Sequence, residues 1–87
     1  MKTYALYHDP GPNVSEVDEM IRQLESQHML EVQRVKLDTI EGADMAKLYD
    51  ITQYPAFVVT RDDGQFVQSW VGKPFPLTDE IAGYARM

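Results

Sequence analysis

The feature that most constrains the fold is a short, almost unbroken apolar segment late in the chain. Residues 56–60 read Ala-Phe-Val-Val-Thr, and Pro55 stands immediately before them. A strand with apolar side chains on both faces has to be covered on both sides. The proline also favours extended backbone at Tyr54, which ends any preceding helix. The segment therefore predicts a central strand in a sheet with helices packed on each face.

A second pattern, near the N-terminus, is typical of an amphipathic helix. Apolar residues recur there at spacings of three and four: Val14, Val17, Met20, Ile21 and Leu24. Asn13 is a favourable N-cap by residue type, and Glu16, three residues later, completes a capping-box-like pair. A strand over residues 3–7 comes first, and residues 8–12 separate the two elements because their prolines and glycine interrupt regular structure.

The remaining elements are predicted from similar signals. They are a strand over residues 30–37, a short helix that starts at Asp38-Thr39 and ends near Asp50, a strand over residues 66–71 after an Asp63-Gly64 hairpin, and a final helix capped by Thr78. The order is β-α-β-α-β-β-α. A parallel crossover followed by a hairpin predicts an α/β fold with a four-stranded mixed sheet. At 87 residues, we expect one domain over residues 1–87.

Composition excludes several classes of function. The chain contains no cysteine, which removes disulfides, thiolate metal sites, thiol catalysis and CxxC redox chemistry. Its net charge is −6 and its basic residues are scattered, so neither nucleic acid nor a membrane surface is an expected partner. No apolar run approaches the ~20 residues of a membrane-spanning helix. Because the N-terminus also lacks a secretory-signal pattern, we expect a cytoplasmic protein.

The polar residues do not form a recognisable catalytic motif. His8 and Asp9 adjoin at a strand-to-helix junction, where a His-Asp pair suggests a general base and backbone amides suggest an anion site. No Ser-His-Asp order, phosphate loop or HExxH motif accompanies them. We interpret both as residues of a solvated loop, with Asp9 initiating the turn at Pro10. The acidic residues lack EF-hand spacing, and we expect no catalytic residue, metal or cofactor.

The element order, with a proline just before the third strand, resembles the thioredoxin/glutaredoxin superfamily. The similarity covers essentially the whole chain and is densest over residues 32–38 and 46–59. These residues resemble the family pattern of a strand, Asp, a short helix, Tyr-x-Ile-x-x-x-Pro and a buried strand. The resemblance implies a thioredoxin-like three-layer sandwich, in which Pro55 is the cis-proline beside the former active site.

The chain departs from this family at the position of its CxxC motif. A thioredoxin-like alignment places the tetrad at residues 10–13 (Pro-Gly-Pro-Asn), and a glutaredoxin-like alignment places it at residues 12–15 (Pro-Asn-Val-Ser). In both, proline replaces the nucleophilic cysteine and offers no group that could attack. The resemblance therefore implies a redox-inactive member of the family that performs no disulfide exchange.

The resemblance also implies which surface meets a partner. In the family, the residue before the cis-proline faces the partner, which singles out Tyr54. The candidate face comprises Asp9, Pro10, Gly11, Pro12, Asn13, Tyr54, Pro55 and Gly72. An extended peptide can add to free backbone groups without any sulfur, although the prolines remove some donors.

The leading hypothesis is a non-catalytic adaptor or assembly module with a protein partner. One alternative is a glutathione-like small-molecule binder, or an enzyme, that uses the same cleft without thiol chemistry. Another is a structural subunit, by analogy with acidic thioredoxin-like proteins without CxxC that are assembly factors for redox enzymes. The sequence defines neither the partner nor the oligomeric state.

Overall fold

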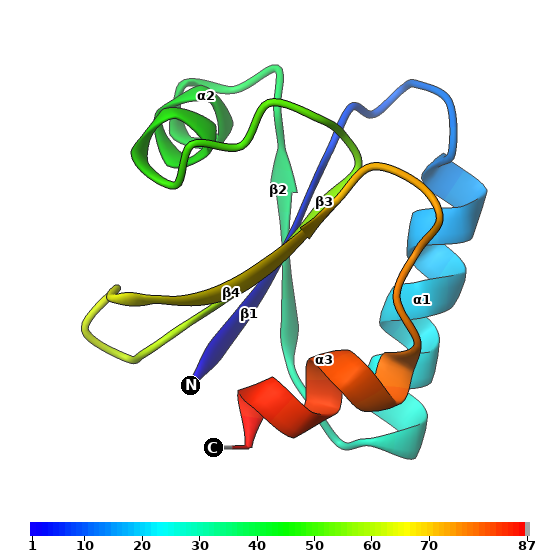
Figure 1. Ribbon diagram of the computed structural model, residues 1–87. Helices are drawn as coiled ribbons and strands as arrows, with labels where there is room; N and C mark the ends of the chain where they lie inside the picture. The colour runs from blue at the N-terminus through cyan, green and yellow to red at the C-terminus, as the bar shows by residue number, and fades with distance from the viewer. Residues whose placement is uncertain (87) are drawn as a thin grey trace.

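The computed structural model describes residues 1–86 and forms three layers (Figure 1). Its elements are β1 (Lys2–Tyr7), α1 (Val14–Gln27), β2 (Val32–Lys36), α2 (Ile40–Leu48), β3 (Ala56–Thr60), β4 (Phe66–Val71) and α3 (Thr78–Ala85). The order β-α-β-α-β-β-α confirms the predicted fold class, and the arrangement is thioredoxin-like. Within residues 1–86, no helix has the length and apolarity needed to cross a membrane.

The four strands form one mixed sheet in the order β2-β1-β3-β4. β1 runs parallel to β2, whereas β3 is antiparallel to both β1 and β4. All five residues of β3 are buried. This burial confirms that the apolar segment over residues 56–60 is a central strand with both faces covered.

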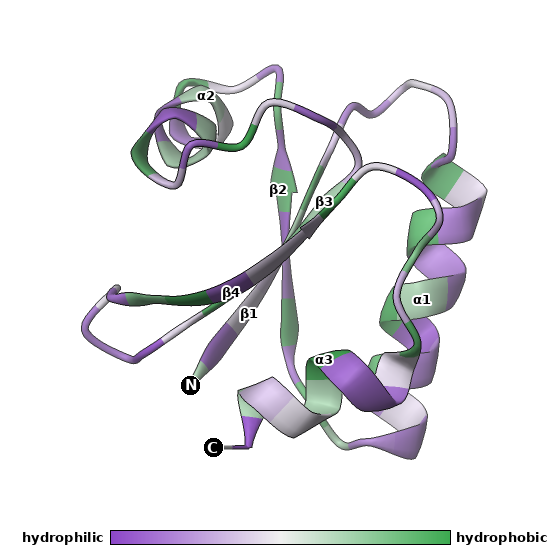
Figure 2. Ribbon diagram, in the orientation of Figure 1, coloured by the Kyte–Doolittle hydropathy of each residue, from purple (hydrophilic) through white to green (hydrophobic). Residues whose placement is uncertain are grey.

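One face of the sheet is covered by α1 and α3. Val17, Ile21 and Leu24 of α1 meet Phe57 of β3 and Ile81 of α3 in a single buried cluster. Figure 2 shows the hydrophobic positions of α1 turned toward the sheet. Burying a leucine or isoleucine side chain stabilises a fold by about 1.5–3 kcal/mol, so this cluster fixes α1 and the loop that leads into it.

The opposite face is covered by α2. Ala46 of α2 and Ile51, just beyond the helix, pack with Leu6, Val35 and Val58 in a second buried cluster. Thr39 is the N-cap of this helix, and its Oγ1 accepts a hydrogen bond from the Gly42 amide at 3.0 Å. A side-chain cap of this kind pairs an amide that the helix leaves unbonded, and the predicted start at Asp38-Thr39 is confirmed.

The predicted capping box at the start of α1 is wrong. Asn13 precedes the helix, but its φ of 69° is left-handed and its side chain makes no capping hydrogen bond. Side-chain capping requires extended backbone at this position. Glu16 points elsewhere, since its Oε1 and Oε2 lie 2.9 and 2.8 Å from Nζ of Lys73.

The predicted cap of the last helix is also wrong. Thr78 is the first residue of α3, and Leu77 occupies the capping position without a side-chain hydrogen bond. On this helix Ile81 is fully buried, whereas Tyr84 is 36% exposed.

Candidate functional site

Three loops meet at one end of the sheet and carry the predicted partner face. They are the loop from β1 to α1, the segment that enters β3 and the turn that leaves β4 (Figure 1). Asp9, Pro10, Gly11, Pro12 and Asn13 lie on the first loop, Tyr54 and Pro55 on the second, and Gly72 on the third. The sheet topology therefore brings together segments that are distant in the sequence.

Four of the eight predicted residues share a small pocket. Its volume is about 40 Å³, and it is lined by Tyr7, His8, Pro12, Asn13, Tyr54 and Pro55. Gly72 adjoins this group because its amide donates a hydrogen bond to the Pro55 carbonyl at 2.9 Å. Gly72 has a φ of +67°, and a Cβ there would approach Oε1 of Gln53 to 2.9 Å. Glycine thus suits this turn on both counts.

Tyr54 is the most prominent side chain of the face. Its hydroxyl donates to the carbonyl of Ile51 at 3.0 Å, and its ring meets the His8 ring edge-on with centroids 5.6 Å apart. Pro55 behind it is buried, while 37% of Tyr54 stays exposed. The peptide bonds before Pro10, Pro55 and Pro74 are all cis. The face therefore presents an aromatic ring that is held in place yet open to solvent.

His8 does not pair with its neighbour Asp9. Nδ1 of His8 lies 3.1 Å from Oδ1 of Asp38, whereas Oδ2 of Asp9 lies 3.9 Å from Nζ of Lys36. Both partners of the His8–Asp38 pair are solvated, with side chains 47% and 60% exposed. The pair joins the loop after β1 to the start of α2 and leaves no adjacent His8–Asp9 unit that could act as a general base.

Three other predicted residues do not belong to the pocket. Asp9, Pro10 and Gly11 do not line it, and Pro10 and Gly11 are exposed. The predicted face did not include Tyr7, which is 97% buried as the last residue of β1 and still lines the pocket. The end of an apolar strand that meets a functional loop is a signal that could have identified it.

Cations around this face are paired with carboxylates. The pairs are Arg34 with Asp18, Lys36 with Asp9, and Lys73 with Glu16. Hydrogen bonding to the Tyr7 hydroxyl and to the Asp18 carboxylate raises the pKa of the Arg34 guanidinium. Lys73 also lies 5.9 Å from the centroid of the Phe75 ring. Locally balanced charge gives this end of the domain no strong field for an ionic ligand.

The chemistry available at the face is that of a shallow binding surface. Across residues 1–86, no three His, Cys, Asp or Glu side chains gather into a possible metal-binding group. A volume of about 40 Å³ accommodates little more than one water molecule or the tip of a side chain. Small-molecule pockets occupy about 300–1,000 Å³. The pocket is therefore too small to enclose a typical small-molecule ligand.

Comparison with known proteins found no match, either among protein-family models or among curated proteins. What is shown is a domain with a thioredoxin-like fold and no cysteine.

Proposed function

We propose that this chain is a redox-inactive member of the thioredoxin/glutaredoxin superfamily, and that it binds a protein partner through the face around Tyr54 and Pro55. The supporting observation is the combination found at that face. The part-exposed ring of Tyr54 lies beside the small pocket, yet the chain has no thiol for the family's chemistry. The proposed role is that of a non-catalytic adaptor or assembly module.

Backbone groups at Tyr54 favour strand addition as the binding mode. Within residues 1–86, neither the amide nor the carbonyl of Tyr54 has a backbone hydrogen-bond partner, whereas the Pro55 carbonyl accepts a hydrogen bond from the Gly72 amide. An extended segment of a partner can bond to such groups and place a side chain in an adjoining pocket. Pro10 and Pro12 lack an amide donor, so backbone pairing concentrates on the Tyr54 side of the face.

Pocket volume favours this function over the glutathione-like alternative. A tripeptide needs far more than the about 40 Å³ available between Tyr54 and Pro12. We expect glutathione to cause no saturable amide shifts in residues 8–13, 54–56 and 72–73 of the ¹⁵N-labelled protein. Saturable shifts confined to those residues would favour the small-molecule alternative.

Truncation of the exposed ring tests the proposed face. Tyr54→Ala should weaken the affinity for a captured partner by about thirtyfold, which corresponds to about 2 kcal/mol for the loss of an interface aromatic. Tyr84→Ala is the matched control, because Tyr84 is 36% exposed against 37% for Tyr54 and lies on α3. Thermal unfolding checks that both variants are folded. Unchanged affinity in Tyr54→Ala would place the binding surface elsewhere.

A further inference from the structure

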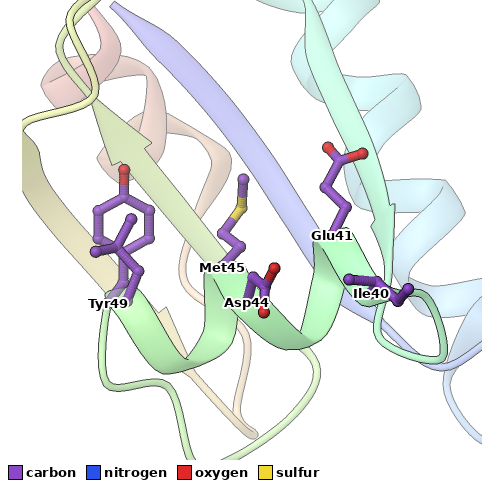
Figure 3. A pocket seen from close by; sticks show the side chains of 6 residues that line it. Ile40, Glu41, Asp44, Met45 and Tyr49 are labelled. Atoms are coloured by element: carbon purple, nitrogen blue, oxygen red, sulfur yellow. The ribbon is translucent and has the colours of Figure 1, made fainter.

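A second surface lies on the outer side of α2 and shares no residue with the pocket at Tyr54. A depression of about 470 Å³ follows this helix, lined by Ile40, Glu41, Asp44, Met45, Leu48 and Tyr49. Figure 3 shows the labelled side chains distributed from the first turn of α2 to its end. The proposed function does not use this surface.

The distribution of residues on α2 is unusual for a helix that only covers a sheet. Its buried residues are the small ones, Gly42 and Ala46. Its large aliphatic residues face solvent instead, with Ile40 83% and Leu48 74% exposed. An amphipathic surface helix normally turns such side chains inward. Neighbouring exposed apolar residues mark an interaction site more often than isolated ones do.

The floor of the depression is held by the core. Met45 and Tyr49 are half-buried and pack against the cluster beneath α2. The Tyr49 hydroxyl donates to the Gly64 carbonyl at 2.6 Å, and its ring lies 5.9 Å from the Phe66 ring. Phe66 is 45% exposed, so the apolar surface continues from α2 toward β4.

The two charged side chains that line this depression, Glu41 and Asp44, are both acidic. Glu41 and Asp44 form no ion pair with any residue in the range 1–86, in contrast to the paired charges around Tyr54. In a symmetric contact between two copies, the same acidic patch would line both sides of the interface. Like charges across an interface are destabilising, and the chain already carries a net charge of −6.

We propose that the outer face of α2 is a second docking surface, and that its occupant is a cationic amphipathic helix of another protein. Leucine-type side chains of that helix fill the depression, while its lysines or arginines reach Glu41 and Asp44. The nine residues of α2 span about 13 Å, enough for between two and three turns of a partner. Because α2 already pairs its own backbone groups, recognition here uses side chains and not strand addition.

A synthetic peptide of about 14 residues, or about four helical turns, is a suitable probe. One face carries leucines and the flanks carry lysines; the control peptide replaces each lysine by glutamate. We expect the cationic peptide to shift the amide resonances of residues 40–49 in the ¹⁵N-labelled protein, with affinity that falls as salt increases. The acidic peptide should cause no such shifts.

Variants of the chain localise the contact. Leu48→Ser should weaken binding of the cationic peptide by about tenfold, because an interface leucine loses its apolar burial. Leu77→Ser is the control, since Leu77 is 70% exposed outside α2, and it should leave the affinity unchanged. Glu41→Gln with Asp44→Asn should weaken binding and flatten its salt dependence. Tyr54→Ala should have no effect, which separates this proposal from the proposed function.

Several outcomes would overturn the proposal: no binding of the cationic peptide, shifts confined to residues outside α2, equal binding of the acidic peptide, or no loss in Leu48→Ser. Sedimentation of the free protein tests whether a second copy of the chain occupies this face instead. Self-association that Leu48→Ser abolishes would assign the face to a second copy of the chain and likewise overturn the proposal.

Discussion

Replacing Gly42 by alanine is a sharp test of how closely α2 packs on β2. A Cβ at this position would lie 2.1 Å from the carbonyl oxygen of Lys36 and 3.0 Å from Cα of Leu37. Comfortable carbon–oxygen contacts begin near about 3.3 Å, so α2 must move by more than about 1 Å. The Lys36 carbonyl cannot move away without losing hydrogen bonds, because it accepts them from the Thr39 hydroxyl and amide at 2.7 and 3.2 Å.

The expected change in the free energy of unfolding for Gly42→Ala is the sum of opposing effects. Alanine is favoured over glycine in a helix interior by about 1 kcal/mol. Overpacking costs about 1–3 kcal/mol, and disturbing the Thr39 cap adds about 1 kcal/mol. We therefore expect Gly42→Ala to lower the free energy of unfolding by about 2 kcal/mol. With a urea m value of about 1 kcal/mol/M, the midpoint falls by about 2 M.

Gly83→Ala is the matched control, because a Cβ on this α3 glycine meets no atom within 4 Å. Here only helix propensity acts, and stability should rise by about 0.5–1 kcal/mol. Urea unfolding followed by the fluorescence of Trp70, the single tryptophan, measures both variants. If Gly42→Ala matched or exceeded the wild-type stability, the close approach of α2 to β2 would be refuted.

Three other predictions concern the same framework. Leu24→Ala should lower the free energy of unfolding by about 3 kcal/mol through the cavity it leaves, whereas exposed Leu77→Ala should change it by less than about 0.5 kcal/mol; equal losses in urea would contradict the packing. Thr39→Ala should cost about 1 kcal/mol by removing a cap, measured by the same unfolding assay. Burial, and then repulsion from Tyr4 and Asp63, raises the pKa of Tyr49 above 10.0. The resulting stability is present below that value and is lost as pH rises through the folded-state pKa. Tyr49→Phe should therefore lose less stability than the wild type between about pH 9 and about pH 11, and identical pH profiles would contradict the assignment.

The bounds of β3 and β4 could be predicted because their signals are local, whereas β2 (Val32–Lys36) is shorter than the strand predicted over residues 30–37. The apolar run over residues 56–60 and the hairpin before residues 66–71 specify β3 and β4 with the bounds observed in the structure. The sequence signals for the first residue of a helix were less reliable. The cap at Asn13 fails because its backbone is left-handed, with a φ of 69°; asparagine favours both this conformation and the capping position, so the residue type alone does not decide between them.

The orientation of α2 could not be predicted from its composition. The helix contains small and large apolar residues on different sides, and periodicity alone does not decide which side meets the sheet. Close approach at Gly42 selects the small side, so Ile40 and Leu48 are left exposed. The docking surface on α2 is therefore a result of tertiary packing.

The candidate site was partly accessible from sequence. The resemblance placed Tyr54, Pro55, Pro12 and Asn13 on one face, and the structure brings these four residues into one pocket. The pairing of His8 with Asp38 was not accessible, because it joins residues 30 positions apart through the paths of two loops. Adjacent residues such as His8 and Asp9 are poor guides to pairing when the chain turns between them.

Affinity capture from a lysate of the source organism tests the central claim most directly. The bait would be the wild type, Tyr54→Ala or Tyr84→Ala, each shown to be folded. The account predicts one protein that the wild type and Tyr84→Ala retain and that Tyr54→Ala loses. Equal recovery by all three baits would contradict binding at the Tyr54 face, and recovery of nothing by the wild type would contradict a stable protein partner and favour the small-ligand alternative.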